Sequence, residues 1–465
     1  KKKSLIHRNI FLFKKKTEER RRRMKGNMAN QLYSACMNGN IEQVKQHLAS
    51  SKLESDEINQ ASNYGFTPFH RACENGHIEI VKLLLNDERV DINQVSNSGW
   101  TPFYVACQEG HIEIVKLFLN DKRVDINKAS NSGWTSFYVA CYKGHIEIVK
   151  WMLESGREID INKGNVNNLT PFYIACWNKH IEIVKLLLND KRVDINKATP
   201  FWNACCFGHI EIVKILLNDE RNETNQTEYG RTPFWIACEK GHIETTKLLL
   251  NDERVDINKA ENEYGKTPFW IACQNGKIEI VKELLNDERV DINQANNNGE
   301  TPFYVACQKG HIEVVKLLLN SERIDVNQGD NKNDWTPLYI ACWKGSIEIV
   351  KLLLNYERVD INQASKYDET PLYIACAIGD IEIVELLLVN ERVIDSIRTK
   401  NKDGKTPIDI ARENGREEKK KRESEEQFHQ RKQKYRAIIQ LLESFERNPT
   451  EIRAQYLDLK DNSIP

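Results

Sequence analysis

The chain has 465 residues, of which 40% are hydrophobic and 29% are charged, and its net charge at pH 7 is −1. This composition is typical of a soluble globular protein, and the length is sufficient for a large buried core. No run approaches the roughly 18–20 consecutive apolar residues that a membrane-spanning helix requires, so the sequence predicts no transmembrane segment.

The N-terminal segment is strongly basic. The first 25 residues carry twelve Lys or Arg residues against two Glu residues, a net charge of +10. The numbering begins at Lys1, whereas Met24 and Met28 stand close to the first recognisable repeat. We interpret residues 1–27 as a disordered basic segment that is either a natural part of the protein or a fragment or gene-model extension.

Residues 28–415 consist of one unit that recurs about twelve times. A Thr-Pro pair, with Thr-Ser once in its place, recurs at spacings of 29 to 36 residues. Its threonines are Thr67, Thr101, Thr135, Thr170, Thr199, Thr232, Thr267, Thr301, Thr336, Thr370 and Thr406. A period of this length is the signature of stacked repeats, in which each unit packs on its neighbours.

The unit from Thr101 to Asn131 predicts two short helices and a turn. Thr101 is a suitable N-cap, Pro102 suits the first helical position, and Gly110 can end this helix in the left-handed conformation. A second helix is expected over 111–120, because its apolar residues cover most of its circumference. An alternating segment and a turn at 131–133 follow, which predict a hairpin-like finger. Since helices this short are not stable alone, stacking must supply the fold.

The segments Thr-Pro-Phe-Tyr-Val-Ala-Cys, Gly-His-Ile-Glu-Ile-Val-Lys-Leu and Val-Asp-Ile-Asn occur in this order in the unit. Together they resemble the ankyrin repeat, whose pattern is Thr-Pro-Leu-His, Gly-His and a terminal Asp-Val-Asn. The resemblance covers residues 28–415 and implies an all-α repeat fold, an ankyrin solenoid of stacked antiparallel helix pairs with short β-hairpin fingers. It also implies a concave groove that binds a protein partner, whose identity the sequence does not give.

Two departures from the family pattern recur along the array. The histidine of Thr-Pro-Leu-His survives only as His70 and is aromatic elsewhere, which we interpret as a ladder packed between repeats, with partner contact as the alternative. The aromatic residues are Tyr104, Tyr138, Tyr173, Trp202, Trp235, Trp270, Tyr304, Tyr339 and Tyr373. The family's Gly after the second helix is also missing, so the usual left-handed cap is not expected there.

The middle of the array is irregular. About five finger residues are missing where Ala198 runs directly into Thr199, and residues 222–225 depart from Val-Asp-Ile-Asn. Thr245 and Thr246 replace the Ile and Val of the second helix, which removes buried methyl groups worth about 1 kcal/mol or more each. We therefore predict a bend or a break in cooperativity within residues 197–246.

The C-terminal end departs from the repeat in a different way. Residues 416–436 form a charged insertion with a net charge of +4, which we interpret as a solvated extension that can be helical. Residues 437–448 resemble the second helix that the last repeat would otherwise lack, so we predict a terminal capping helix there. A tail over 449–465 follows.

Cysteine and histidine recur at the repeat period without the clustering that zinc requires. Eleven cysteines follow Ala and are expected to be small core side chains, whereas Cys206 stands apart and is interpreted as a free thiol without a role. The histidines before Ile-Glu give way to Lys277, Ser346 and Asp380 in other copies, which favours a structural interpretation. With no phosphate-binding loop or nucleophile elbow either, we predict no metal, cofactor or small-molecule substrate, and an enzyme is only a remote alternative.

The charge distribution disfavours a nucleic-acid partner along the array. Residues 26–415 carry a net charge of −13, which would repel a phosphate backbone. An adaptor whose residues 1–27 contact nucleic acid or an anionic membrane surface is the alternative to a protein-binding scaffold. The free thiols favour a cytoplasmic location, or a nuclear one if residues 1–27 belong to the mature protein, and we expect a monomer.

The resemblance places partner-facing residues just before each Thr-Pro and at the end of each first helix. Aromatic residues occupy several of these positions: Trp100, Trp134, Tyr142, Trp177 and Phe207 over adjacent repeats, and Trp335 with Trp343 nearer the C-terminal end. Because aromatic residues outside the core are frequent hot spots, we predict that the first cluster is the main anchor for an extended peptide or a domain. The alternative is that these rings only cover the finger bases and complete the packing within repeats.

The resemblance also implies that the Asn of Asp-Ile-Asn is a candidate for hydroxylation. These residues are Asn93, Asn127, Asn162, Asn196, Asn258, Asn293 and Asn362. The residues themselves favour a structural role, in which the side-chain amides hold the finger by hydrogen bonds.

Overall fold

The computed structural model describes residues 27–50, 53–418 and 423–454. The basic segment 1–27, apart from its last residue, lies outside the described residues, as do 419–422 and 455–465. The described residues form helices and no β-strand, and none of these helices is long and apolar enough to cross a bilayer. The chain divides into two compact units, one with residues up to 204 and 211–223, the other with 205–210 and residues from 224 onward.

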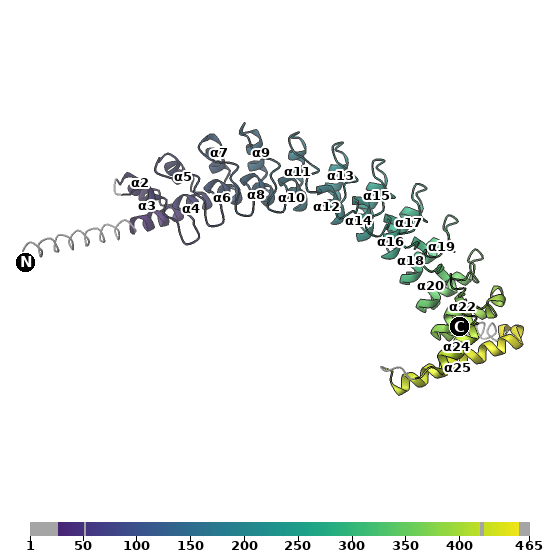
Figure 1. Cartoon of the computed structure of the whole chain (residues 1–465). Coiled ribbons are helices and arrows are strands. Elements are labelled where there is room, and N and C mark those ends of the chain that lie inside the picture. The colour runs from purple at the N-terminus through teal and green to yellow at the C-terminus, as the bar shows by residue number, and fades with distance from the viewer. Residues whose placement is uncertain (1–26, 51–52, 419–422, 455–465) are drawn as a thin grey trace, which may run out of the picture. The chain divides into compact units, whose positions relative to one another are not determined.

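Each repeat contributes two short helices, and within each unit the first helices lie along one side and the second helices along the other (Figure 1). The first helices are α4 (Pro68–Glu74), α6 (Pro102–Glu109), α8 (Ser136–Lys143), α10 (Pro171–Trp177), α12 (Pro200–Cys206), α14 (Pro233–Lys240), α16 (Pro268–Gln274), α18 (Pro302–Lys309), α20 (Pro337–Lys344), α22 (Pro371–Ile378) and α24 (Pro407–Arg416). The second helices are α2 (Ile41–Ala49), α5 (Ile78–Leu85), α7 (Ile112–Asn120), α9 (Ile146–Glu154), α11 (Ile181–Leu188), α13 (Ile210–Leu217), α15 (Ile243–Leu250), α17 (Ile278–Leu285), α19 (Ile312–Leu319), α21 (Ile347–Leu354), α23 (Ile381–Val389) and α25 (Glu425–Arg447). Residues 27–38 and 449–454 are also helical, α3 spans Ser55–Ile58, and a 3₁₀ helix, η1, spans Glu391–Ile397.

Helix starts and ends follow the predicted pattern. Thr101 Oγ1 accepts a hydrogen bond from the Tyr104 backbone N–H at 3.0 Å, and Gly110 ends α6 with a φ of 82°. The second helices end differently, since Asn86 after α5 has a φ of −85°. The prediction that these ends lack the left-handed cap is therefore confirmed.

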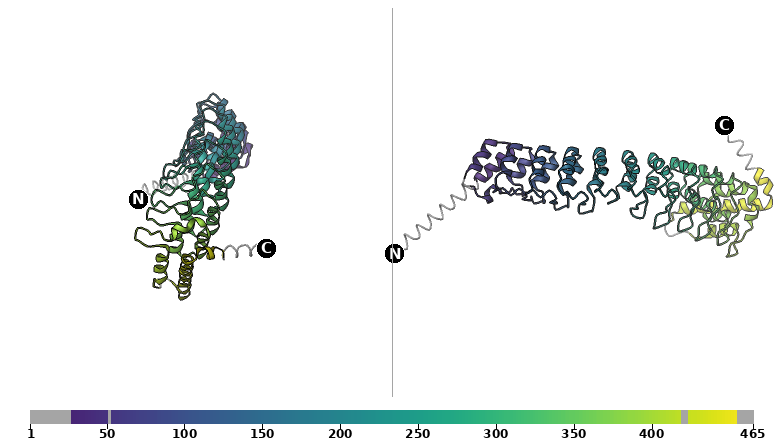
Figure 2. Two further views of the ribbon diagram at one scale, coloured as in Figure 1. Left: turned by 90° about the vertical axis from the view of Figure 1, so that its right-hand side faces the viewer. Right: turned by 90° about the horizontal axis from the view of Figure 1, so that it is seen from above.

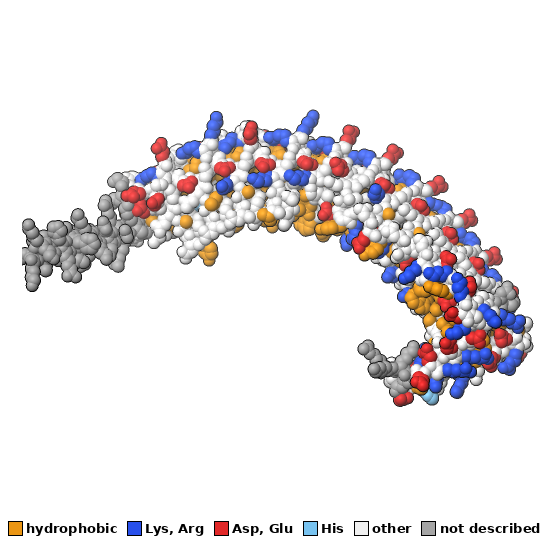
Figure 3. Space-filling model, viewed as in Figure 1, with side chains coloured by type: hydrophobic (Ala, Val, Ile, Leu, Met, Phe, Trp, Pro, Cys, Tyr) orange, Lys and Arg blue, Asp and Glu red, His pale blue; other side chains and the backbone are white. Residues whose placement is uncertain are grey.

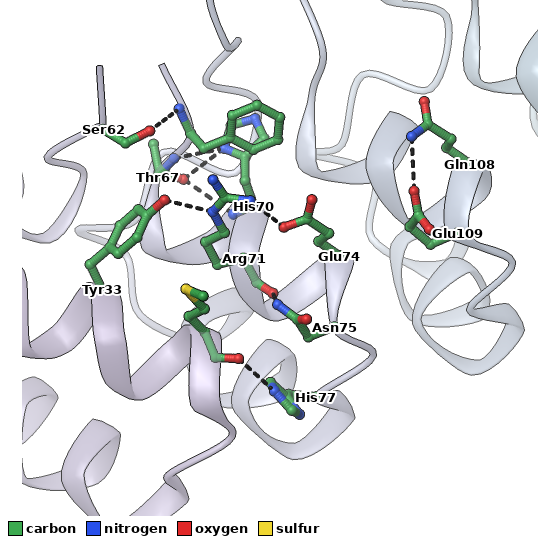
Figure 4. Close-up of polar contacts among 12 residues, drawn as sticks. Tyr33, Ser62, Thr67, His70, Arg71, Glu74, Asn75, His77, Gln108 and Glu109 are labelled. Atoms are coloured by element: carbon green, nitrogen blue, oxygen red, sulfur yellow. Dashed lines mark hydrogen bonds and ion pairs between the residues drawn. The ribbon is translucent and has the colours of Figure 1, made fainter. Parts of the chain in front are cut away.

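The repeated histidines hold neighbouring repeats together. The Nε2 atom of His77 donates to the carbonyl oxygen of Met37 at 3.1 Å (Figure 4), and His111 donates to Glu74 in the same way at 2.9 Å. The His77 ring lies over Gly39, where an added Cβ would come within 2.7 Å of it. Glycine is thus required both for its positive φ and for this close approach. The structural interpretation of these histidines is confirmed.

The Asn of Asp-Ile-Asn forms a second link between repeats. Asn93 Nδ2 donates to the carbonyl of Arg123 at 2.8 Å, and Asn93 Oδ1 accepts from the Asp125 backbone N–H at 2.8 Å. Asn127, Asn162, Asn196, Asn258 and Asn293 make the same pair of bonds with the next repeat, and Asn362 donates to the Arg392 carbonyl. Because both ends of the amide are used, the hydrogen-bonding interpretation is confirmed.

An arginine after most of the second helices forms a third link, which was not among the predictions from the sequence. Arg89 Nη2 donates to the Leu48 carbonyl at 2.7 Å, at the end of the preceding second helix, and pairs with Asp87 at 2.6 Å. The hydrogen bond from Arg89 lowers the pKa of the Asp87 carboxyl below its usual value. The Asn-Asp-Glu-Arg segment therefore satisfies helix-end carbonyls that a glycine cap would otherwise serve.

The aromatic residues in place of the family histidine are packed inside the units. Seven of the nine are buried, and Tyr173 and Trp202 are half-buried. His70 Nε2 donates to the Trp100 carbonyl at 2.8 Å, and Trp270 Nε1 donates to the equivalent carbonyl of Glu300 at 2.8 Å. Tryptophan thus replaces histidine without losing the inter-repeat hydrogen bond, which confirms the packed ladder.

The fingers differ from the expectation, because the connecting loops, which project to one side of the helices (Figure 2), are turns and not β-hairpins. In the finger at 96–100, Ser96 N donates to the Trp100 carbonyl and Gly99 N donates to the Ser96 carbonyl. Elsewhere in the described residues, one isolated bridge joins Glu228 and Arg231. The physical reason is that a typical finger closes in one tight turn and then bonds to the backbone of the adjacent finger, as when Asn131 N donates to the Ser98 carbonyl at 3.0 Å, so no ladder forms between two strands.

The irregular middle of the array combines strain with buried polar groups. Ala198 and Thr199 have φ values of 68° and 52°, in the left-handed region that a β-branched residue rarely adopts. Asn222 takes the place of a core valine, and both of its side-chain polar atoms are buried without a partner in the described chain. The division between the two units falls within residues 197–246. The bend or cooperativity break expected there stays a prediction.

The C-terminal end is closed by a single long helix. α25 includes residues 425–436 of the predicted insertion and continues through the predicted capping segment, 437–448, to Arg447. Tyr435, Ile438, Leu442 and Phe445 are its buried residues, and the Tyr435 hydroxyl donates to the Ala377 carbonyl at 2.7 Å. The insertion and the cap are thus continuous in the described residues.

Candidate partner-binding face

The predicted anchor residues lie where the resemblance placed them, before the first helices and at their ends. Trp100 and Trp134 immediately precede the N-caps of α6 and α8, and both are half-buried. Tyr142 lies in the last turn of α8, and Trp177 is the last residue of α10. These four residues belong to the first unit, and we call them the aromatic face.

Trp100 is held by rings on two sides. It stacks on Tyr104 of its own repeat at a centroid distance of 5.5 Å and an interplanar angle of 19°. Its edge also meets Phe66 of the preceding repeat at 6.0 Å. The Phe66 ring in turn lies 4.6 Å below the Arg71 guanidinium. The packing alternative therefore describes part of the role of Trp100.

A polar network lies at the N-terminal end of this face (Figure 4). Arg71 Nε donates to the Tyr33 hydroxyl at 2.6 Å, and its guanidinium pairs with Glu74. Because this arginine is already engaged by an acid, a phenol and a ring, it adds little free charge to the face.

Trp134 and Tyr142 form the centre of the aromatic face. The Trp134 ring lies 5.1 Å from Tyr138 and 5.3 Å from Tyr142. Tyr138 is buried, whereas Tyr142 is exposed at the surface. The buried Tyr138 thus supports Trp134, which in turn contacts Tyr142, and the two outer rings keep part of their apolar surface in solvent.

Trp177 is the most exposed tryptophan of the aromatic face, with 41% of its surface in solvent. Its ring lies 6.0 Å from Tyr173 of the same helix. Phe207, the fifth residue of the predicted cluster, belongs to the second unit, is exposed, and lies 5.9 Å from the His209 ring. The structure therefore groups four of the five predicted residues in one unit.

Trp335 and Trp343 form a direct pair in the second unit. Their ring centroids are 4.8 Å apart, Trp335 stacks on Tyr339 at 5.5 Å, and Trp343 is exposed beneath the Lys344 ammonium at 4.8 Å. The Trp335 Nε1 atom is buried and has no hydrogen-bond partner in the described chain.

The equivalent positions before the other first helices of the second unit carry charges. Arg231 lies over Trp235 at 4.5 Å, Lys266 lies over Trp270 at 4.8 Å, and Glu300 and Glu369 occupy the next comparable positions. In the first unit the same row holds Phe66, Trp100, Trp134 and Leu169. In Figure 3 the side of the first unit formed by its first helices shows mostly white and orange surface, whereas charged side chains line the second-helix side.

Sequence reasoning missed two sets of exposed aromatic residues. Trp151 lies on the second helix α9, beneath the Lys116 ammonium at 4.6 Å, and is 42% exposed. Exposed tyrosines stand at four finger turns: Tyr64, Tyr229, Tyr264 and Tyr367. For the tyrosines, the available signal in the sequence was an aromatic residue directly before the Gly or Asp of the turn. These positions lie outside both sets of partner-facing positions, the residue before each Thr-Pro and the end of each first helix.

The thiols give no sign of redox or nucleophilic chemistry. Eleven of the twelve cysteines are buried, and all twelve are free. Burial raises the pKa of the Cys36 thiol to about 12, so it stays protonated near neutral pH. Burial also raises the pKa of the half-exposed Cys206, which disfavours its thiolate. Among the described residues, no group of three or more His, Cys, Asp or Glu side chains could hold a metal ion.

Comparison with protein families agrees with this geometry. The model for ankyrin repeats in three copies matches residues 32–130, 122–199, 201–296 and 269–365, and the model for ankyrin repeats in many copies matches residues 345–388. No curated protein matches the chain.

Proposed function

The chain belongs to the ankyrin-repeat family, and we propose that it is a non-enzymatic scaffold that binds a protein partner through the aromatic face of its first unit. Arrays of ankyrin repeats serve in general as protein-interaction modules. The finer statement is that Trp100, Trp134, Tyr142 and Trp177 form the anchor.

One observation carries this proposal: tryptophan and tyrosine remain partly exposed on a face where packing against neighbouring rings fixes their orientation. Trp134 is supported by the buried Tyr138, and Trp177 stands on Tyr173. Rings held in this way lose little conformational entropy on binding and offer large apolar area, which is how aromatic hot spots work. The packing contacts and the anchor role are therefore compatible, because each of these rings packs on a neighbouring ring and still keeps part of its surface in solvent.

The Trp335–Trp343 pair is proposed as a second, smaller anchor in the second unit. Its flanking rows are charged, so it offers an apolar patch with a charged rim. We also propose a cytoplasmic location, since the twelve free thiols suit a reducing compartment.

The test compares two tryptophans with nearly equal exposure on opposite sides of the first unit. Full-length protein carrying Trp177→Ala is compared with Trp151→Ala in crosslinking affinity capture from source cells, followed by affinity measurement with the captured protein. We expect Trp177→Ala to weaken binding by about thirtyfold or more, as for a hot spot of 2 kcal/mol, and Trp151→Ala to leave it unchanged.

The double variant Trp134→Ala, Trp177→Ala should abolish capture while circular dichroism remains that of the wild type. Equal affinity of the wild type, Trp177→Ala and the double variant would refute the aromatic anchor. Loss of binding only on Trp343→Ala would move the main anchor to the second unit.

A further inference from the structure

The C-terminal cap contains a pocket that is lined by basic side chains. It has a volume of about 500 Å³ and lies between α24 and α25. Its lining residues are Arg412, Gly415, Arg416, Lys432, Arg436, Ile439 and Gln440. Four of the seven carry a positive charge, one donates through an amide, and none is acidic.

Helix geometry makes the four charges converge. Arg412 and Arg416 are four residues apart on α24, and Lys432 and Arg436 are four residues apart on α25, so each pair lies on one face of its helix. Both faces line the same pocket. Figure 3 shows many Lys and Arg side chains over this C-terminal part of the second unit.

The two helices that carry the pocket are fixed by close packing. An added Cβ at Gly415 would lie 3.0 Å from the Tyr435 Cβ, so the absence of a side chain allows α25 to approach α24. The buried Ile438 and Leu442 and the hydrogen bond from the Tyr435 hydroxyl to the Ala377 carbonyl hold α25 in place. The positive charges are therefore presented by a rigid scaffold and not by a loop.

Most of this charge has no acidic partner. Arg412 pairs with Glu443 at 2.8 Å and approaches Asp409 at 4.0 Å. Arg416, Lys432 and Arg436 form no ion pair with any described residue, although the Lys432 ammonium lies 4.6 Å above the Phe428 ring. Like charges four residues apart repel each other, so the arrangement is unfavourable for the empty cap and is relieved by an anion.

We propose that this pocket binds the phosphate group of a phosphorylated protein segment. A phosphate monoester carries a charge near −2 at pH 7 and three strong acceptor oxygens, which match two or three guanidinium groups that donate in pairs. The volume exceeds that of a phosphate group, so it also admits the side chain that carries the phosphate and parts of its neighbours.

Charge elsewhere in the chain favours a peptide over a polymeric anion. Residues 26–415 have a net charge of −13, which would repel the long phosphate backbone of a nucleic acid. A single phosphate in a concave pocket avoids that penalty. This site is separate from the aromatic face, so either proposal can fail while the other holds.

The test uses a phosphoserine tripeptide, Ala-phosphoserine-Ala, as the probe and the full chain as the receptor. Binding is measured by titration calorimetry at low and at moderate salt, with Ala-Ser-Ala as the uncharged control. We expect binding of the phosphorylated probe only, and an affinity that falls as salt rises.

The triple variant Arg416→Gln, Lys432→Gln, Arg436→Gln should weaken binding at least tenfold, because it removes three charge-assisted contacts. The matched control Lys122→Gln, Lys191→Gln, Lys259→Gln removes the same charge from exposed lysines elsewhere and should bind like the wild type. Glu443→Gln frees Arg412 from its acidic partner and should strengthen binding.

Several outcomes would overturn the proposal. Equal affinity of the two triple variants would show that only general charge matters. Stronger binding to vesicles of phosphatidylcholine with phosphatidylinositol 4,5-bisphosphate, or to a uridine oligonucleotide, than to the tripeptide would assign the pocket to a membrane or to RNA. A folded triple variant, checked by circular dichroism, that retains wild-type affinity for the tripeptide would remove the pocket from consideration.

Discussion

Replacing a buried threonine in α15 should stabilise the second unit. Thr245 and Thr246 are 1% and 0% exposed, and neither hydroxyl has a hydrogen-bond partner in the described chain. The helix of the next repeat, α17, has Ile280 and Val281 at the same two positions, both fully buried. The surroundings of this position in the stack thus accept aliphatic side chains of this size.

The magnitude follows from the chemistry of the exchange. Thr246→Val replaces a hydroxyl by a methyl group of nearly the same shape, so it removes the desolvation cost of an unsatisfied polar group, about 1–3 kcal/mol. Thr245→Ile removes the second hydroxyl and adds one methylene, worth about 0.8 kcal/mol if the space accepts it. We expect the two adjacent changes to be partly additive.

Urea denaturation of the full chain, followed by tryptophan fluorescence and circular dichroism, measures the effect. The transition of the second unit should move to higher urea, and hydrogen exchange should slow in α15. Thr227→Val, at an exposed finger position, is the control and should change little. An unchanged or lower midpoint for Thr246→Val would refute the reasoning, since it would mean that the hydroxyl is already bonded, for example to its neighbour Cys238.

Two further predictions concern the first unit. Burial lowers the pKa of His70 from 6.5 to about 4, so the unfolded chain takes up the proton first and stability is lost as the pH falls from about 6.5 to 4. Tyr104 occupies the equivalent position in the next repeat. The variant His70→Tyr should therefore lack this pH dependence, as measured by hydrogen exchange in α4. Lys179 has a φ of 59° where most other repeats have Gly, so Lys179→Gly should stabilise the first unit by about 1 kcal/mol in urea denaturation. If Lys179→Gly instead lowers the free energy of unfolding by about 1 kcal/mol, the lysine side chain makes a stabilising contact that outweighs the backbone strain.

The local features of the repeat were predictable because they depend on neighbouring residues and occur many times. Thr101 and Pro102 together indicate where α6 begins, and Gly110 indicates where it ends. A single copy would be ambiguous, but repetition at a fixed period removes the ambiguity. The burial of the Ala-Cys thiols followed from the same logic.

Contacts between repeats were harder to predict, since they join residues about 30 to 40 positions apart. The local sequence does not indicate that Arg89 donates to the Leu48 carbonyl, or that Trp270 donates to the Glu300 carbonyl. The fingers were expected to be hairpins because alternating residues followed by a turn are typical of strands. Their backbone groups bond instead to the backbone of adjacent fingers, as Asn97 N does to the Tyr64 carbonyl, and only the stacked structure reveals these contacts.

The candidate sites illustrate the same limit. The positions of Trp134 and Trp177 in the repeat were sufficient to place them on one face, whereas their exposure depends on how Tyr138 and Tyr173 pack beneath them. The basic pocket was not predicted, because the sequence shows residues 416–436 as mixed charge. Only the antiparallel approach of α24 and α25 brings the four cations into one pocket whose lining has no acidic residue.

The departures from the repeat pattern are not spread evenly along the chain. Strained backbone at Thr199, unpaired polar atoms in Asn222, and the buried hydroxyls of Thr245 and Thr246 all fall within residues 197–246. In a stacked array, the free energy of folding is the sum of terms for the repeats and for the interfaces between them. Several unfavourable terms in one place therefore weaken the coupling between the folding of the repeats that precede this region and the folding of those that follow it. A break in cooperativity then follows from energetics alone and does not require a bend. We therefore expect two unfolding transitions, one for each unit. Restoring aliphatic residues at 245 and 246 should bring their midpoints closer together. If the midpoints stay equally far apart, the shortened finger before Thr199 is the cause of the break instead.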